Sequence, residues 1–355
     1  MEHNLHYNVS TKFIRYKHMF TIENQVSGKV FQTKGKDNIL NDALARGLNF
    51  PYGCQKGFCG KCKAIIIEGE VGYVGEIPSG ITPEEVAEGM VLLCQCKAKS
   101  DVTLVVAELD SVADIEVRTF PCKVRSIKHF NHDVVQVFLK ILGSESLQYL
   151  AGQYIDLIHP DFEPRAFSIA NAPSNTSLIE LHVRLIEDGK FTNFIFNELQ
   201  EKSLLKIEGP KGDFYFREKS KKSIILVTGG TGFGPVKAMI EHAIETKSRR
   251  MIHIYWGVRD EKGLYTDLPE QWAKSHENIS FIPVLSQANS AWKGRTGYVH
   301  ESVLADFEHL VDYEVYACGP PAMVKAASNT FVKRGMFKEN FFSDAFEFSF
   351  EGNTL

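Results

Sequence analysis

The spacing of apolar residues changes twice along the chain, which predicts three successive modules. The first part combines short alternating stretches with brief helical spacings and a cysteine-rich loop. Its predicted elements are a hairpin at residues 19–22 and 28–32, helices at 38–46 and 83–89, and a buried strand at 63–68. Thr82, a residue type that caps helices, precedes the second helix. Charges interrupt the apolar pattern at residues 109–120, so we expect a linker there and a new module from Pro121.

The second part alternates apolar and polar residues between clusters of Gly, Pro and Asn. Its predicted strands cover residues 134–139, 154–158, 179–184 and 204–208. Short strands separated by turn residues are typical of an antiparallel barrel or of a sandwich, and the pattern alone leaves both open.

From residue 223 onward, short apolar strands alternate with helical patterns. The predicted strands are 224–227, 252–256, 279–284 and 314–317, and the predicted helices are 235–245 and 322–333. This alternation predicts a parallel α/β sheet. The whole chain is therefore expected to be a multidomain protein of α+β and α/β type, with modules at residues 18–110, 118–218 and 222–348.

The composition is that of a globular protein with several cores. A chain of 355 residues is too long for one ordinary core, and three modules suit its length. Its net charge is −4 and it has no basic stripe of the kind that neutralises phosphates, so we expect no nucleic-acid partner. No apolar run approaches the roughly 18 residues that read as a membrane span. We therefore expect no membrane anchor and a cytoplasmic protein.

The cysteines point to a metal site. Seven cysteines in a long chain expected in a reducing compartment argue against a disulfide framework. Cys54, Cys59 and Cys62 have the C-x4-C-x2-C spacing of a plant-type 2Fe-2S site, for which Cys94 would supply the fourth thiolate. Glycines at positions 53, 57 and 60 can adopt positive φ, which would turn backbone amides towards the anionic sulfurs.

Two alternatives accompany this prediction. Cys96 competes for the fourth position, and we favour Cys94 because it directly follows the apolar residues 91–93, as the last ligand does in plant-type sites. Buried cysteines or a zinc knuckle would also use this residue type. Zinc sites usually bring two C-x2-C sets, however, and this chain has one.

The cysteine loop resembles plant-type ferredoxin, and the three modules together resemble the ferredoxin-NADP reductase-like enzymes that feed oxygenases and other metalloenzymes. The resemblance implies a β-grasp fold for the first module, an FAD-binding barrel for the second and an NAD(P)H-binding sheet for the third. It also implies an oxidoreductase in which a nicotinamide reduces the flavin and the cluster exports electrons singly.

The second module carries the flavin motif of this family. Arg165-Ala166-Phe167-Ser168 matches its R-x-Y-S pattern, although Phe167 lacks the hydroxyl of the usual tyrosine. The resemblance implies that Arg165 pairs with the flavin pyrophosphate and that Ser168 lies beside the reacting N5 atom. Further implied FAD contacts are His182, Val183, Arg184, Gly189, Lys190, Phe191 and Thr192. FAD is preferred over FMN by analogy with relatives that carry the ferredoxin module first.

The third module contains a glycine-rich turn between a strand and a helix. Its residues are Gly229, Gly230, Thr231 and Gly232, whose backbone amides could meet a pyrophosphate at the start of the helix. A tight turn without any ligand produces the same pattern. Cys318, Gly319 and Pro320 begin a C-G-P-x-x-M motif that borders the nicotinamide in the family, so the resemblance places Cys318 near the hydride path.

Two expectations concern the nicotinamide itself. Phe346 is expected either to shield the flavin and move aside for nicotinamide, or simply to pack in the core. NADH is the preferred donor, because no pair of basic residues follows the strand that ends at Trp256. Arg259 and Lys262 keep NADPH open, since either could meet its 2′-phosphate.

Four stretches look particularly like the reductases of the CDP-6-deoxy-Δ3,4-glucoseen type, which supply electrons to a dehydrase in 3,6-dideoxy sugar synthesis. These stretches are residues 151–157, 168–173, 253–257 and 342–346. The alternatives are the reductase component of a ring-hydroxylating or di-iron oxygenase and a non-enzymatic redox carrier. In the first two cases the acceptor is a metalloenzyme that docks transiently, and Lys56, Lys61 and Lys63 would suit an acidic face on it.

Overall fold

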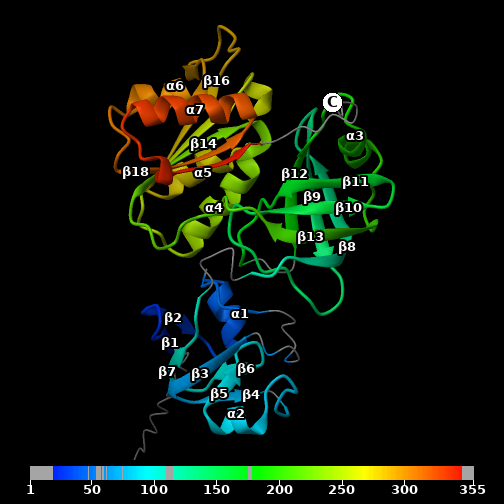
Figure 1. Cartoon of the computed structure of the whole chain (residues 1–355), viewed down its shortest axis with the longest axis vertical. Helices are drawn as coiled ribbons and strands as arrows, with labels where there is room; N and C mark the ends of the chain where they lie inside the picture. Colours follow the sequence, from blue (N-terminus) through cyan, green and yellow to red (C-terminus); the bar gives the residue numbers. More distant parts are fainter. Residues whose placement is uncertain are drawn as a thin grey trace, which may run out of the picture.

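The computed structural model folds as three modules, the first at one end of the molecule and the other two side by side (Figure 1). It describes residues 19–46, 48–52, 57, 60, 62–73, 75–108, 115–174 and 178–345. Within these residues, each module has its own sheet and its own buried apolar cluster.

The first module is a small mixed sheet in the order β2-β1-β7-β3-β5, beside a two-stranded sheet of β4 and β6. Its elements are β1 (Phe20–Asn24), β2 (Lys29–Thr33), α1 (Ile39–Leu44), β3 (Lys63–Glu68), β4 (Val71–Tyr73), α2 (Pro83–Ala87), β5 (Met90–Leu92), β6 (Cys96–Ala98) and β7 (Val102–Val105). The predicted hairpin is confirmed, because β1 and β2 pair antiparallel. Thr82 caps α2 as expected, accepting a hydrogen bond from the Glu85 amide.

The second module is a six-stranded antiparallel sheet in the order β11-β10-β13-β8-β9-β12. Its elements are β8 (Arg118–His129), β9 (Val134–Ile141), β10 (Tyr154–His159), β11 (Phe162–Ser168), β12 (Ile179–Arg184), α3 (Lys190–Asn197) and β13 (Leu204–Lys211). An antiparallel bridge between Ile169 and Leu181 joins the two edges of this sheet. Because the sheet curls onto itself, the module is a half-barrel, which decides against the sandwich.

The linker prediction was wrong at its end. β8 begins at Arg118, so residues 118–120 belong to the barrel. Phe120 is buried in the barrel core. Its inward-facing side chain makes this segment a strand, although the charged neighbours suggested a linker.

The third module is a parallel sheet in the order β17-β16-β15-β14-β18-β19, covered by helices. Its elements are β14 (Ser223–Gly229), a 3-10 turn η2 (Gly230–Gly232), α4 (Phe233–Glu245), β15 (Ile252–Val258), η3 (Glu261–Gly263), α5 (Leu268–Ser275), β16 (Ile279–Leu285), β17 (Arg295–Thr296), α6 (Val299–Asp306), β18 (Tyr313–Gly319), α7 (Pro321–Lys333), η4 (Lys338–Asn340) and β19 (Phe341–Ala345). The predicted parallel α/β sheet is confirmed, with β19 as an additional edge strand beside β18.

The second and third modules share packing. Val134 and Ala151 of the second module belong to the same buried cluster as Phe233 and Trp256 of the third. The first module lies with α1 at the end that faces the other two (Figure 1). None of the helices in the described residues combines the length and the hydropathy required to cross a membrane.

Candidate functional site

The second and third modules bring three polar side chains together at their junction. The Ser168 hydroxyl, at the end of β11, donates to Asp344 Oδ2 across 3.3 Å. The Cys318 thiol approaches the same carboxylate oxygen at 4.0 Å, because Cys318 and Asp344 are partners in the parallel pairing of β18 and β19. The sequence predicted Ser168 beside the flavin and Cys318 near the hydride path, but it did not single out Asp344, which contacts both.

Burial sets the protonation of this group. Desolvation raises the pKa of the Asp344 carboxyl above its usual value, while the hydrogen bond from Ser168 acts in the opposite direction. Cys318 is fully buried, and burial together with the charge of Asp344 raises the pKa of its thiol well above the ordinary range. The site therefore holds a neutral thiol and a carboxyl with strengthened affinity for a proton.

The glycine-rich turn lies directly against the C-G-P motif. A Cβ atom on Gly232 would lie 2.3 Å from the Cys318 carbonyl oxygen, and one on Gly229 would lie 2.8 Å from Met323 Sδ. Trp256 holds the turn from the neighbouring strand, since its indole nitrogen donates to the Gly230 carbonyl at 3.0 Å. The two motifs therefore form one surface at the carboxyl ends of β14 and β18, which is where open α/β sheets bind their ligands.

Arg184 reaches this surface from the barrel. Its guanidinium pairs with Asp133, with Nη2 at 2.7 Å from Oδ2 and Nε at 2.8 Å from the same oxygen. A Cβ atom on Gly230 would lie 3.0 Å from Arg184 Nη1, so the side chain lies beside the glycine turn. A half-exposed guanidinium at this junction could contact a phosphate without losing its acidic partner.

His182, by contrast, is enclosed in an internal network. Its Nε2 is 2.9 Å from Glu180 Oε1, and its Nδ1 is 3.0 Å from the Tyr265 hydroxyl. Burial lowers the pKa of His182, so a neutral ring can donate to the carboxylate and accept from the tyrosine. Lys237 of α4 completes the network by donating to Glu180 Oε2 at 2.9 Å.

Glu180 stays ionised inside this network. Burial acts to raise its pKa, but the hydrogen bond from His182 and the charge of Lys237 outweigh burial and lower the pKa to about 2. Glu180 and Lys237 come from different modules, so the network ties the barrel to the third module. Sequence reasoning missed it because an isolated Lys or Glu in a strand or helix is usually solvated.

The remaining flavin candidates lie on β11 and at the start of α3. Arg165 is half-buried on β11, and Phe167 packs against Phe191 with ring centroids 6.2 Å apart. Gly189 is the residue before α3, and this helix has no side-chain cap, so its first amides are available to an anion. Thr192 turns its hydroxyl back to the Gly189 carbonyl at 3.1 Å. These residues fit a bound pyrophosphate.

The metal loop is described in part. Cys54 and Cys59 lie outside the described residues, as do Lys56, Lys61 and Phe346. Cys62 and Cys94 are both buried. A hydrogen bond with Cys62 lowers the pKa of Cys94 to about 6, and the Gly57 and Gln95 contacts contribute in the same direction. Thiolate character at Cys94, beside the buried Cys62, fits ligation of a cluster.

Gly57 and Gly60 have the backbone conformation that the sequence predicted. Their φ angles are 79° and 71°, in the left-handed region that glycine adopts most readily. The Gly57 amide is directed at the Cys94 sulfur, and the Gly57 carbonyl accepts from the Gly80 amide at 2.8 Å. Within the described parts of the chain, no group of three or more His, Cys, Asp or Glu side chains forms a metal site.

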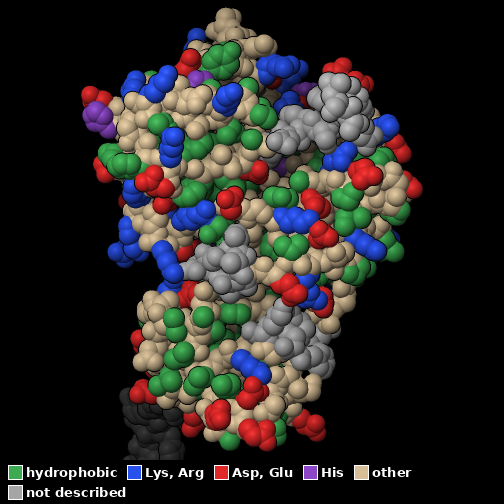
Figure 2. Space-filling model, viewed as in Figure 1, with side chains coloured by type: hydrophobic (Ala, Val, Ile, Leu, Met, Phe, Trp, Pro, Cys, Tyr) green, Lys and Arg blue, Asp and Glu red, His purple; other side chains and the backbone are tan. Residues whose placement is uncertain are grey.

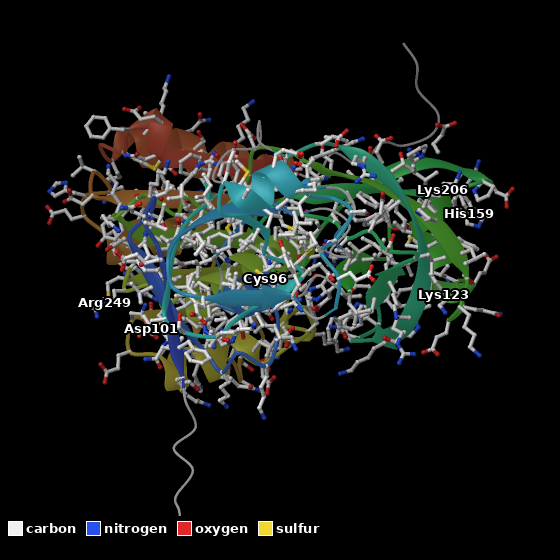
Figure 3. The ribbon with its side chains drawn as sticks, turned by 90° about the horizontal axis from the view of Figure 1, so that it is seen from below. Cys96, Asp101, Lys123, His159, Lys206 and Arg249 are labelled. Carbon is white, nitrogen blue, oxygen red and sulfur yellow. The ribbon has the colours of Figure 1, made fainter. Side chains whose placement is uncertain are left out.

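The structure separates Cys94 from its competitor. Cys96 lies on β6 in the interior of the first module (Figure 3), where burial raises the pKa of its thiol to about 12. Lys63 pairs with Glu85 at 2.6 Å, and its expected role towards a partner stays a prediction.

Comparisons with known proteins agree with this arrangement. A 2Fe-2S iron-sulfur cluster binding domain matches residues 22–99, an oxidoreductase FAD-binding domain matches residues 121–216, and an oxidoreductase NAD-binding domain matches residues 226–329. CDP-6-deoxy-L-threo-D-glycero-4-hexulose-3-dehydrase reductase of Yersinia pestis is 45% identical over 320 residues, covering 90% of this chain and 96% of that protein. The chain belongs to this family of iron-sulfur flavoprotein reductases.

More distant members share the same three modules. Phenol hydroxylase P5 protein of Acinetobacter pittii is 32% identical over 327 residues, covering 90% of this chain and 92% of that protein. The structure of the Amycolatopsis cytochrome P450 reductase GcoB superposes with a TM-score of 0.61 at 27% identity, covering 92% of this reductase and 98% of that chain. The reductase is an NAD(P)H-dependent oxidoreductase whose cofactors are FAD and a 2Fe-2S cluster.

Proposed function

We propose that this reductase takes electrons from NADH and delivers them to a dehydrase that acts on a CDP-linked 4-keto-6-deoxyhexose. The observation that carries the proposal is the 45% identity to the Yersinia pestis dehydrase reductase, which extends over 96% of that protein. The match covers 90% of this chain and therefore spans all three modules. The phenol hydroxylase component is matched over a similar length but at 32% identity.

We assign the hydride-transfer site to the junction of Ser168, Cys318 and Asp344. Bound flavin supplies the conversion of a two-electron donor into single electrons for the cluster. The chain's own contribution is to orient and to handle protons. Ser168 presents a hydroxyl that already donates to Asp344 at 3.3 Å, and the buried carboxyl, when ionised, can accept a proton beside it. Cys318 adds a small, neutral thiol that leaves room for a planar ring.

The pyrophosphate groups are assigned to two backbone sites. In the barrel, Arg165 and the residues Gly189, Lys190, Phe191 and Thr192 at the start of α3 would bind the FAD pyrophosphate. In the third module, Gly229, Gly230, Thr231 and Gly232 would bind that of NADH. The side chains of His182 and Val183 are both buried, so these residues would contact FAD through the backbone of β12.

The cluster is assigned to Cys54, Cys59, Cys62 and Cys94. The contact between Cys62 and Cys94, the Gly57 amide directed at Cys94 and the high pKa of Cys96 support this set. Phe346 is kept as a residue that would cover the flavin, because it follows β19 and Asp344 in the chain.

Acceptor choice is tested by reconstitution. The reductase with its cofactors, NADH, a CDP-6-deoxy-4-hexulose 3-dehydrase and its CDP-sugar should consume NADH in step with the sugar, and NADPH should be the weaker donor. The same reductase should support a phenol hydroxylase oxygenase much less well. Efficient support of the oxygenase together with none of the dehydrase would replace the proposal with the oxygenase alternative, which the 32% identity to the phenol hydroxylase component supports.

The route through the cluster is tested separately. Ferricyanide accepts electrons from the flavin, whereas cytochrome c should require the cluster. Cys94→Ser should therefore lose cytochrome c reduction and retain ferricyanide reduction. Cys96→Ser is the matched control, since Cys96 is a buried cysteine two positions away. Equal loss in both variants would contradict the assignment of Cys94 as the fourth ligand.

A further inference from the structure

The first module is attached to the barrel by hydrogen bonds that converge on residues 49–52, just before the cysteine loop in the sequence. The Gln148 side chain, in the segment between β9 and β10, accepts from the Tyr52 amide at 3.1 Å and donates to the Phe50 carbonyl at 2.7 Å. Its amide also approaches Asn49 Oδ1 at 3.4 Å. Gln148 thus bonds to the backbone on both sides of Pro51, in the way that a neighbouring strand would.

The adjoining residues strengthen this contact. The Tyr52 hydroxyl donates to the Leu147 carbonyl at 3.1 Å, and both residues are buried. Phe50 is fully buried beneath them. A buried hydroxyl and a buried amide without these partners would carry a desolvation cost, so the two modules are held in one relative position here.

The contact continues towards the flavin side of the barrel. Tyr149, next to Gln148, is fully buried, and its hydroxyl lies 3.0 Å from the Asn171 carbonyl and 2.9 Å from the Ala172 carbonyl. These carbonyls follow β11, which ends at Ser168. The segment Leu147–Tyr149 therefore touches the stretch that enters the metal loop on one side and the stretch that leaves the flavin motif on the other.

We propose that Gln148 is a positioning residue that holds residues 49–52, which lead into the cysteine loop, against the barrel and so sets the rate at which electrons pass between the two cofactor sites. In the sequence, Tyr52 lies two residues before Cys54, one of the proposed cluster ligands. Electron exchange between sites on separate modules requires a defined approach, and small displacements are costly. Gln148 itself is a polar, half-buried residue that no motif includes.

The test compares Gln148→Ala with the wild type, both as holoenzyme. We expect ferricyanide reduction by NADH and its KM for NADH to be unchanged, while stopped-flow reduction of the cluster slows by about tenfold to a hundredfold. Hydrogen exchange provides a readout that does not depend on turnover. The Tyr52 amide should exchange faster in Gln148→Ala, because its acceptor has been removed.

Two further variants sharpen the test. Gln148→Glu keeps an acceptor for the Tyr52 amide but cannot donate to the Phe50 carbonyl, so cluster reduction should fall to an intermediate rate. Gln200→Ala is the matched control, because Gln200 is an exposed glutamine of the same barrel without a described side-chain partner. It should leave the cluster reduction rate and the Tyr52 exchange rate unchanged.

The inference rests on the proposed route from flavin to cluster, and the results distinguish the two. If NADH does not reduce the cluster in the wild type, the route itself is wrong. If NADH reduces the cluster equally fast in the wild type and Gln148→Ala, the route stands and the role of Gln148 is overturned. A slower rate that only matches a proportional loss of iron and sulfide per chain would also overturn it, because Gln148 would then retain the cluster rather than position it.

Discussion

At the scale of single residues, backbone proximity explains why the glycine-rich turn requires a residue without a side chain at Gly232, which lies 86 positions before Cys318 in the sequence. Gly232 approaches the Cys318 carbonyl so closely that a Cβ atom would lie 2.3 Å from it. A Cβ atom on Gly234, two positions along, would have no neighbouring atom nearer than 3.5 Å. Gly232 in the turn therefore excludes any side chain, whereas Gly234 at the start of α4 tolerates a methyl group.

This difference predicts opposite effects on stability. Gly232→Ala should lower the free energy of unfolding by about 1 to 3 kcal/mol and raise KM for NADH, because the turn must move away from β18. Gly234→Ala, within α4, should be neutral or stabilising by about 0.5 to 1 kcal/mol. Urea unfolding followed by tryptophan fluorescence measures both, since Trp256, Trp272 and Trp292 all lie in the third module. Equal destabilisation by the two substitutions would contradict the close approach.

Asp344 is the residue whose charge state should govern the hydride-transfer site. Asp344→Asn removes the carboxyl that Ser168 contacts, and we expect flavin reduction by NADH to slow by about tenfold to a hundredfold. Asp312→Asn, an exposed carboxyl of the same module, should have no effect. Stopped-flow bleaching of the flavin measures both rates.

The pH dependence of the same reaction follows from the raised pKa. Protonation of Asp344 persists to a higher pH than for an ordinary aspartate, whose pKa is 3.8. Because Ser168 donates to the ionised form, the wild-type rate should fall as pH drops through a value above 3.8, and Asp344→Asn should lack this inflection. A wild-type profile without the inflection would remove the proposed role of the carboxyl.

At the scale of elements, short helices and turns place the cluster ligands. The helix α1 is only six residues long and depends on its cap, in which Asn38 Oδ1 accepts from the Asn41 amide at 2.8 Å. The Leu40 amide donates to the Leu93 carbonyl at 3.1 Å, immediately before Cys94. The start of α1 therefore supports the backbone that presents a proposed ligand.

Removal of this cap should weaken the first module. Asn38→Ala should lower its free energy of unfolding by about 0.5 to 2 kcal/mol and speed the loss of cluster absorbance in urea, because the Asn41 amide loses its partner. Asn38→Asp keeps an acceptor at the same place and should restore both properties. If Asn38→Ala and Asn38→Asp lose the cluster equally fast, the cap does not support the ligand.

At the scale of the whole molecule, buried polar contacts join modules that have separate cores. Lys237 of the third module donates to Glu180 and to the Ala170 carbonyl of the barrel, each at 2.9 Å. On the face shown in Figure 2, charged side chains of both signs are interspersed over the second and third modules. The tie between these two modules is therefore a specific buried network as well as shared apolar packing.

Breaking this network should loosen the junction. Lys237→Met leaves Glu180 buried without its cation, and we expect a loss of about 3 to 5 kcal/mol in the free energy of unfolding. Lys274→Met is the control, because the Lys274 side chain is 79% exposed and its Nζ atom lies 4.0 Å from Glu270 Oε2. The control should change stability by less than about 0.5 kcal/mol. A small effect of Lys237→Met would mean that packing alone holds the modules.

Acid should reveal the same network. The pKa of Glu180 is about 2 in the folded protein, below its ordinary value of 4.5, so its stabilising contribution is complete above pH 4.5 and is lost as pH falls towards 2. Glu180→Gln should remove this part of the pH dependence. Unfolding curves recorded at a series of pH values across this window measure it, and identical slopes for wild type and variant would contradict the assignment.

Sequence by itself determined the three modules, the family and most of the motifs. Strand and helix periods depend on which residues face a core, so the hairpin of β1 and β2 and the parallel sheet could be read from local spacing. The spacing of Cys54, Cys59 and Cys62 and the flavin and C-G-P motifs are likewise local patterns. Where charged residues disguised an inward-facing one, as at Phe120, the local pattern failed.

Only the tertiary structure decided which of these residues meet. Asp344 joins Ser168 and Cys318 because β19 pairs with β18 at the barrel junction, and no spacing along the chain records that pairing. Gln148 and Lys237 were also invisible in the sequence, since their partners lie 96 and 57 positions away. Contacts between modules depend on how separately folded surfaces come together, and that arrangement has no period for a sequence to display.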